Sequence, residues 1–357
     1  MVRVRLSPAS GSAFRTYSSF RVCRDTSRHL PAAGEALRAR VARLPDKTSA
    51  ARTKTGAKIA QTTAVIVARR HWPHLRRDRK AILIMSRKPV PPLEPGWVIV
   101  NGSPMFHRFS LDAGDAADAM VHVHGFGISG TYLEPTAALL APHFRTFVPD
   151  LPGMGRSIRP EGGLDLPGLA KALMAYCDAI GVERPILVGN SLGCPIIVEV
   201  ATTFPDRIDR AVLVSPAGGP NNQPLGKAVG QMAMDGLREP PSMLPIATRD
   251  YLRFGALRSL SLFRAMTRYP TLERLPHLVA PTLVVAGLRD PLVRIANAPR
   301  LAVMPHLDIV TVPGAHALNY SDPELIAELI EAYLAGEPLR TQTGRRSVVG
   351  HIRVESS

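Results

Sequence analysis

Cysteine is scarce in this sequence of 357 residues, which holds only Cys23, Cys177 and Cys194. Three cysteines, none of them in a Cys-x-x-Cys pair, cannot build the disulfide framework of a small secreted protein. The sequence also lacks His and Cys clusters at metal-ligand spacing, so we expect no metal and no cofactor. No run approaches the roughly 18 apolar residues of a membrane-spanning helix. We therefore expect a cytoplasmic protein without a transmembrane segment.

Acidic residues are scarce in the N-terminal quarter of the chain. Residues 1–88 hold 21 Lys and Arg against 4 Asp and Glu, a balance of +17, whereas residues 89–357 hold 23 and 25, a balance of −2. The overall charge of +15 therefore belongs to the first segment. The remainder has no electrostatic footprint for nucleic acid, and we expect no nucleic acid to bind there.

Three explanations of the basic segment 1–88 stay open. The first is a disordered basic arm, and the second is a transit-like peptide rich in Arg and Ser. The third is an upstream extension of a protein whose translation begins at Met85. We favour the upstream extension, predict that the segment is disordered, and assign no chemistry to it.

The most informative motif is a Gly-x-Ser-x-Gly sequence centred on Ser191. It directly follows the apolar run Pro185–Val188 and precedes the helix-compatible segment Cys194–Phe204. Strand, Gly-x-Ser-x-Gly and helix in that order predict a nucleophile elbow, a tight turn that strains the serine backbone and exposes its hydroxyl. Glycines without Cβ atoms leave room for the neighbouring backbone, and the new helix points free N–H groups at the site. The residues of the motif are Gly189, Asn190, Ser191, Leu192 and Gly193.

From residue 89 onward, strand-like and helix-like segments alternate, which predicts a mostly parallel sheet with helices on both faces. Asn101-Gly102 predicts a hairpin between the first two strands. The expected strands are Trp97–Val100, Met105–Ser110, Met120–His124, Thr146–Pro149, Ile186–Val188, Ala211–Val214, Thr282–Ala286 and Ile309–Val312. The expected helices are Leu133–Ala141, Leu166–Ile180, Ala296–Met304 and Asp322–Leu334.

The interval 216–278 interrupts this alternation, because it has no clear strand but contains helix-like pieces at Leu225–Leu237 and Thr248–Thr267. An insertion of this length between two strands predicts a helical cap or lid over the site. Most of its Met and Leu residues are expected to pack in a core, and a few to line an apolar pocket. The predicted organisation is a core of residues 89–215 and 279–337, a cap of residues 216–278, and a flexible C-terminal tail of residues 338–357.

A serine nucleophile requires a base, an orienting acid and an oxyanion hole. Asp290 lies in a turn just after the expected strand Thr282–Ala286, and His316 lies in the loop after the last strand. The order Ser191, Asp290, His316 is that of a serine hydrolase built on a parallel sheet. We therefore predict these three residues as the catalytic triad.

The predicted oxyanion hole begins where the strand Met120–His124 ends. A glycine turn follows that strand, and it lets backbone N–H groups face the serine. We predict the N–H groups of Phe126 and Leu192 as the two donors. His124, Gly125 and Gly127 are expected to shape the turn.

With these motifs, residues from about 95 to 335 resemble the α/β-hydrolase fold superfamily, in its serine-nucleophile, cap-domain form. The segment Asp150–Ser157 is similar to the family's D-x-x-G-x-G-x-S segment, and the elbow and Pro313–His316 also match. The resemblance implies the doubly wound, eight-stranded α/β sheet of that fold, a triad of Ser191, Asp290 and His316, and a cap at about 216–278. Ser191 stands where dehalogenase-type and epoxide-hydrolase-type relatives carry aspartate, which disfavours those chemistries. The elbow also lacks the Ser-Met-Gly-Gly form of haloperoxidase-like relatives.

The expected function is that of a serine hydrolase acting through an acyl-enzyme. The expected substrate is a small apolar or aromatic ester, lactone or thioester, or a diketone cleaved at a carbon–carbon bond. An acyltransferase using the same triad and a non-catalytic ligand-binding or scaffold protein of the same fold are the alternatives. A homodimer is compatible with the sequence.

Overall fold

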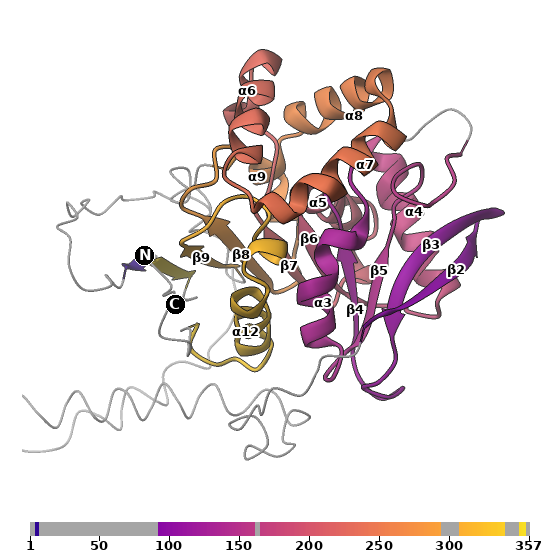
Figure 1. Ribbon diagram of the computed structural model, residues 1–357. Helices are drawn as coiled ribbons and strands as arrows, with labels where there is room; N and C mark the ends of the chain where they lie inside the picture. The colour runs from indigo at the N-terminus through magenta and orange to yellow at the C-terminus, as the bar shows by residue number, and fades with distance from the viewer. Residues whose placement is uncertain (1–3, 7–91, 161–164, 294–306, 340–349, 355–357) are drawn as a thin grey trace, which may run out of the picture. The chain divides into compact units, whose positions relative to one another are not determined.

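The computed structural model describes residues 4–6, 92–160, 165–293, 307–339 and 350–354 (Figure 1). The chain divides into two units, of which one comprises residues 2–14 and 89–357 and contains every described element. The basic segment 1–88, apart from residues 4–6, lies outside the described residues. No helix of the described part has the length and apolar character required to cross a membrane.

The described strands form a single sheet in the order β1-β10-β9-β8-β7-β6-β4-β5-β3-β2. Strands β5, β4, β6, β7, β8 and β9 are parallel to their neighbours within that run. The strands that correspond to the eight expected ones are β2 (Glu94–Val100), β3 (Ser103–Ser110), β4 (Ala119–Val123), β5 (Arg145–Pro149), β6 (Ile186–Asn190), β7 (Arg210–Val214), β8 (Thr282–Gly287) and β9 (Leu307–Val312). The predicted α/β fold with a mostly parallel sheet is confirmed.

The first two of these strands form the predicted hairpin. β2 and β3 pair antiparallel, with Val100 opposite Ser103. Both turn residues have positive φ angles, 48° at Asn101 and 77° at Gly102. Asn and Gly tolerate this left-handed backbone, whose twist matches that of the two strands.

Helices cover both faces of the sheet, because alternate residues of its strands point to opposite sides. In β7, Ala211 and Leu213 belong to a core cluster with α4 (Leu166–Ala179) and α5 (Gly193–Thr203). Val212 and Val214 belong to a second cluster with α12 (Pro323–Leu334). α3 (Glu134–Leu140) contributes Leu140 to that second cluster. Burial on both sides explains why the parallel strands are continuous apolar runs.

Helices fill the interval between β7 and β8 where a cap was expected (Figure 1). They are α6 (Leu225–Gly236), α7 (Leu244–Phe254), α8 (Ala256–Arg268) and α9 (Thr271–Arg274). The single helix predicted at Thr248–Thr267 is wrong, because Gly255, with a φ of 87°, separates α7 from α8. The helix predicted at Ala296–Met304 lies outside the described residues.

Two short strands extend the sheet beyond the eight expected. β10 (Gly350–Val354) pairs antiparallel with β9, and β1 (Val4–Leu6) pairs antiparallel with β10. Residues 350–354 of the predicted flexible tail and residues 4–6 of the predicted disordered extension are therefore ordered in the sheet, and the prediction was wrong for them. The physical reason is that β9 would otherwise be an edge with unpaired backbone groups, which a further strand satisfies.

Candidate active site

Ser191 lies in a sharp turn between β6 and α5. Its φ of 56° is in the left-handed region that side chains other than glycine rarely adopt. The Ser191 N–H donates to the carbonyl of Val214 at 3.1 Å, and the Ser191 carbonyl accepts from the N–H of Cys194 at 3.1 Å. This backbone pairing holds the strained turn, and strain of this kind is typical of functional residues.

The two glycines of the elbow are required by close backbone approach. A Cβ atom on Gly189 would lie 2.8 Å from the carbonyl carbon of Gly193. A Cβ atom on Gly193 would overlap the carbonyl oxygen of Val123 in β4. The start of α5 can therefore pass directly over the ends of β4 and β6, which brings Ser191 to the carboxyl end of the sheet.

His316 and Asp290 form a buried pair. His316 Nδ1 lies 2.7 Å from Asp290 Oδ2, and the two residues are only 6% and 7% exposed. The other carboxylate oxygen of Asp290 accepts from the N–H groups of Leu292 at 2.8 Å and Val293 at 3.1 Å. Asp290 is thus fixed by its own turn, and it directs the Nδ1–H of His316 toward itself, which leaves Nε2 to act as a base.

Asn190 ties the histidine loop to the serine elbow. Its Nδ2 donates to the carbonyl of Val214 at 3.1 Å and to the carbonyl of His316 at 3.2 Å. Within the described part of the chain, His316 Nε2 has no hydrogen-bond partner, and Ser191 Oγ is therefore not bonded to it. Such contacts are often long in unliganded enzymes and tighten when substrate binds.

The turn after β4 lies against Ser191. A Cβ on Gly125 would be 3.2 Å from Ser191 Cβ. The Gly125 N–H donates to the Tyr132 hydroxyl at 2.8 Å, and that hydroxyl donates to Asn190 Oδ1 at 2.7 Å. Tyr132 therefore bridges the turn to the elbow, a role that its sequence position did not distinguish from core packing.

The N–H groups of Phe126 and Leu192 are the predicted oxyanion donors. Among the described residues, neither group donates a backbone hydrogen bond. Leu192 directly follows Ser191. Phe126 directly follows Gly125, and Gly125 contacts Ser191. Both donors are therefore available on the backbone segments that border the serine.

His124 shapes this turn and does not act as an acid or base. Its Nε2 accepts the N–H of Leu151 at 2.8 Å, so its proton resides on Nδ1, which donates to the Gly125 carbonyl at 2.8 Å. Burial lowers the pKa of His124, although the nearby charge of Asp150 opposes the shift. A neutral imidazole in one fixed tautomer thus holds Gly125 in position.

Two carboxylates from the interval between β7 and β8, Asp235 and Glu239, lie beside His316, and no sequence motif marks either of them. Glu239 Oε1 accepts from the N–H groups of His316 at 2.8 Å and Ala317 at 2.7 Å. Burial raises the pKa of Asp235 to about 7 and also raises the pKa of Glu239. Burial would lower the pKa of His316, but the charge and hydrogen bond of Asp290, together with the charges of Asp235 and Glu239, raise it to about 9. Perturbed pKa values clustered in this way are typical of functional sites.

The family model described as "Alpha/beta hydrolase family" matches residues 120–329 of the chain. The chain belongs to the alpha/beta hydrolase family. The matched residues include the elbow, the cap region, Asp290 and His316. The protein is accordingly a hydrolase, and its substrate is a separate question because one fold hosts many activities.

Curated relatives of this alpha/beta hydrolase cover different parts of it. A protein of Mycobacterium phage D29 that carries the provisional name non-heme haloperoxidase is 29% identical over 63% of the chain and 91% of that protein. A poly(3-hydroxyalkanoate) depolymerase of Ectopseudomonas oleovorans is 25% identical over 64% of the chain and 88% of the depolymerase. A pimeloyl-[acyl-carrier protein] methyl ester esterase of Pectobacterium carotovorum is 36% identical, over only 27% of the chain and 36% of the esterase.

Solved structures support the same fold. A carboxylesterase of Bacillus subtilis matches this alpha/beta hydrolase with a TM-score of 0.57 and 21% identity, covering 70% of the chain and 94% of the esterase. An enol-lactonase of Burkholderia xenovorans LB400 matches with a TM-score of 0.57 and 21% identity, covering 67% of the chain and 99% of the lactonase. At this identity the likeness shows the fold alone.

Aromatic side chains of α7 and α8 pack on the predicted oxyanion turn, residues 125–130. The ring of Phe126 lies 5.1 Å from that of Phe263 and 5.6 Å from that of Phe254, between centroids. Gly127 has a φ of 67°, and a Cβ there would lie 2.8 Å from the Tyr251 ring. The position of α7 and α8 is therefore coupled to the backbone that carries the Phe126 N–H.

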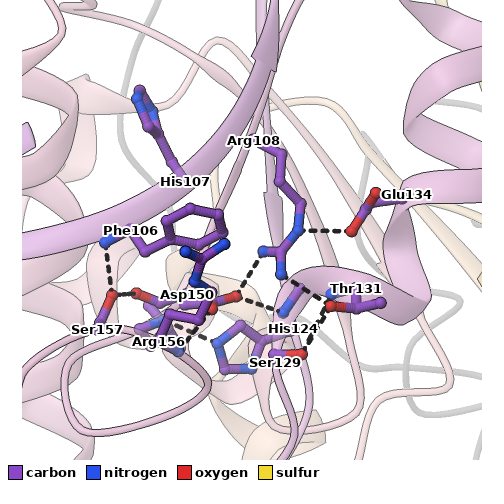
Figure 2. Close-up of polar contacts among 12 residues, drawn as sticks. Phe106, His107, Arg108, His124, Ser129, Thr131, Glu134, Asp150, Arg156 and Ser157 are labelled. Atoms are coloured by element: carbon purple, nitrogen blue, oxygen red, sulfur yellow. Dashed lines mark hydrogen bonds and ion pairs between the residues drawn. The ribbon is translucent and has the colours of Figure 1, made fainter. Parts of the chain in front are cut away.

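On its other side, the oxyanion turn is held by an ion-pair network (Figure 2). Arg108 contacts Asp150 at 2.7 Å and Glu134 at 2.5 Å, and it donates to Thr131 at 2.8 Å. Asp150 also accepts from the N–H of Gly130 at 2.8 Å. The segment Asp150–Ser157 thus has a structural role, because Asp150 anchors the turn through Gly130 and Arg108.

Proposed function

We propose that this alpha/beta hydrolase cleaves a carboxylic ester or a closely related acyl bond through an acyl-enzyme on Ser191. One observation carries the proposal. Ser191 at the elbow has a strained backbone, and the neighbouring residue Asn190 bonds the carbonyl of His316. In the same loop, the buried side chain of His316 is paired with Asp290 at 2.7 Å. This arrangement supports a serine that is activated by a histidine and a carboxylate.

In the first half of the reaction, Ser191 Oγ attacks the carbonyl carbon while His316 Nε2 accepts the hydroxyl proton. The negative charge of Asp290 stabilises the imidazolium that forms. The Phe126 and Leu192 N–H groups bind the oxyanion of the tetrahedral intermediate. Loss of one such donor typically costs about 10²–10³ in rate. The carbon–oxygen bond to the leaving group then breaks, and His316 returns its proton to the leaving oxygen.

In the second half, a water molecule attacks the acyl carbon and gives a proton to His316. Collapse of the second tetrahedral intermediate releases the carboxylic acid, and His316 returns the proton to Ser191 Oγ. Every proton in this scheme passes through His316 Nε2, and no external cofactor enters the balance. Glu239 acts as a positioning residue, since it accepts the backbone N–H groups of His316 and Ala317.

An apolar acyl group fits the surroundings of the serine best. Phe126 lies in a cluster with Phe254 and Phe263 at the base of the cap, and apolar contacts of this kind bind an acyl chain by the hydrophobic effect. The names of two curated relatives describe ester-cleaving enzymes, a depolymerase of a polyester and a methyl ester esterase. These names support an ester rather than a carbon–carbon bond as the substrate.

Hydrolysis of p-nitrophenyl butyrate by the full chain tests the proposal, with Ser191→Ala as the inactive variant. Ser215→Ala is the matched control, because Ser215 directly follows the neighbouring strand β7 with a similar φ of 51° but belongs to no Gly-x-Ser-x-Gly motif. We expect Ser191→Ala to lose at least ~10³ in kcat/KM and Ser215→Ala to retain activity. Release of butyric acid distinguishes hydrolysis from acyl transfer. A fully active Ser191→Ala variant would exclude the mechanism.

A further inference from the structure

A cavity lies outside the candidate active site. Its volume is about 310 Å³, and its lining comes from the β2–β3 hairpin region, the loop after β5 and helix α7 of the cap. The turn from Gly125 to Gly130 separates the two sites, since Gly125 borders Ser191 whereas Gly130 is bonded to Asp150. No predicted triad or oxyanion residue is among its lining residues, which are Leu93, Pro95, Phe106, Arg108, Ser129, Glu134, Gly155, Arg156, Arg249 and Arg253.

The lining is strongly basic, with four arginines and a single carboxylate, that of Glu134. Arg108 is compensated by Asp150 and Glu134. Arg249 pairs with Asp250 at 2.8 Å. Among the described residues, the guanidinium groups of Arg156 and Arg253 have no ion-pair partner.

Within the described part of the chain, the guanidinium groups of Arg156 and Arg253 thus remain without an ion-pair partner, and the four arginines together with the carboxylates of Asp150, Glu134 and Asp250 leave a net charge of +1. Arg156 belongs to the loop after β5, and Arg253 belongs to α7. An anion placed between them satisfies both.

The Arg156 guanidinium is held in place before any anion arrives. Its central carbon lies 3.9 Å from the centroid of the Phe106 ring and 5.8 Å from that of Trp97. Figure 2 shows Arg156 beside Phe106 and above Asp150. Stacking on an aromatic face fixes the plane of a guanidinium while its N–H groups stay available at the edge. The entropy cost of binding an anion is smaller for a side chain ordered in this way.

We propose that this cavity binds a phosphate group, either free inorganic phosphate or the head group of a phosphate monoester. A phosphate is an anion of close to two negative charges at neutral pH, and it can pair with the guanidinium groups of Arg156 and Arg253, which have no ion-pair partner among the described residues. Its oxygens accept paired N–H bonds from the fork of an arginine. Arg249, which donates to Ser129 Oγ at 3.3 Å, lines the same space and carries further N–H donors.

Phosphate binding has a structural consequence for the cap. Arg156 lies on the core and Arg253 on α7, so a bound phosphate joins the two parts. Asp250 of the same helix already accepts from the N–H of Ser129 at 2.8 Å, and Tyr251 contacts Gly127. Phosphate therefore stabilises the position of α7 against the oxyanion turn. This inference does not depend on the identity of the acyl substrate.

Isothermal titration of the full chain with inorganic phosphate, against sodium chloride at equal ionic strength, tests the site. Arg156→Gln and Arg253→Gln remove these two guanidinium groups, and Arg264→Gln on the exposed face of α8 is the matched control. We expect saturable binding of one phosphate, a weakening of at least about tenfold in each cavity variant, and unchanged binding in the control. A thermal melt is expected to show a phosphate-dependent rise in Tm that the double variant loses.

Binding that persists in the double variant would overturn the proposal, because it would come from another basic region such as residues 1–88. Absence of saturable binding to the folded wild type would also overturn it. Sedimentation with phosphatidylcholine vesicles, with and without phosphatidic acid, distinguishes the source of the phosphate. Phosphatidic acid-dependent sedimentation that inorganic phosphate reverses identifies a lipid head group, and saturable titration without sedimentation identifies a soluble phosphate.

Discussion

The carboxylate of Glu239 accepts the backbone N–H of His316 at 2.8 Å. The same oxygen accepts the N–H of Ala317 at 2.7 Å. A residue that follows cap helix α6 is therefore bonded to the loop that carries the candidate base. The position of the cap and the position of the histidine are coupled through this contact.

Replacement of Glu239 separates its geometric role from its charge. Glu239→Ala leaves two N–H groups of the histidine loop without their acceptor, and we expect kcat/KM to fall by about tenfold or more, since such a bond is worth about 1.5–3 kcal/mol. Glu239→Gln retains an oxygen acceptor and is expected to recover most of the activity. Glu273→Gln, an exposed carboxylate of α9, is the control. Equal loss in the Ala and Gln variants would show that charge, not loop position, matters.

The pH dependence of activity follows from the raised pKa of His316. A general base must be neutral before it accepts a proton, and the surrounding carboxylates raise the pKa of His316 to about 9. We expect kcat/KM to rise with pH and to level off near that value. Asp235→Asn removes a negative charge that favours the imidazolium, so the rise should move to lower pH. A profile measured in wild type and variant that is flat from about pH 6 to pH 10 would contradict this assignment.

The close approach of α5 and β4 makes a prediction for stability. A Cβ at position 193 would overlap the carbonyl oxygen of Val123, so Gly193→Ala should lower the free energy of unfolding by about 3 kcal/mol or more. Gly230→Ala is the control, because Gly230 is inside α6 and a Cβ there meets nothing within 4 Å. That variant should gain up to about 1 kcal/mol. Urea denaturation measures both, and similar free energies for the two would refute the packing argument.

The ion-pair network behind the oxyanion turn predicts a further loss of stability. Asp150 is fully buried and Arg108 is nearly so, and removal of one partner leaves the other charge buried without compensation. Arg108→Met should therefore cost about 3–5 kcal/mol of unfolding free energy. Arg184→Met, at an exposed position, should change it by no more than about 0.5 kcal/mol. A small effect at Arg108 in urea denaturation would show that water replaces the ion pair.

The sequence was sufficient for the parts of the site that follow strands. Ser191 directly follows β6, and Asp290 and His316 lie in the loops that follow β8 and β9, so topology places all three at the carboxyl edge of the parallel sheet. The glycines of the elbow could also be recognised from the sequence, because a tight turn of this kind has no room for Cβ atoms at those positions. The strands of the parallel part, β4 to β9, could be read from short apolar runs, because burial on both faces demands such runs.

Other residues gave no local signal because their roles depend on distant contacts. Glu239 reaches a loop 77 positions away, and Tyr132 bonds Asn190 across 58 positions. In the sequence, Glu239 is a carboxylate after a helix and Tyr132 is a tyrosine after a turn, and neither pattern indicates a functional residue. Only the folded arrangement of cap and core gives them a role. The pairing of β10 with β9 was missed for the same reason, since it joins a tail to an edge that the sequence does not mark.

The central claim is that Ser191 is an activated nucleophile. Labelling of the purified full chain with a fluorophosphonate, followed by mass spectrometry of the modified peptide, tests it most directly. We predict one covalent adduct, located on Ser191, that forms in the Ser215→Ala protein and is absent from the Ser191→Ala protein. Folded wild-type protein that stays unlabelled, or an adduct on another residue, would contradict the account.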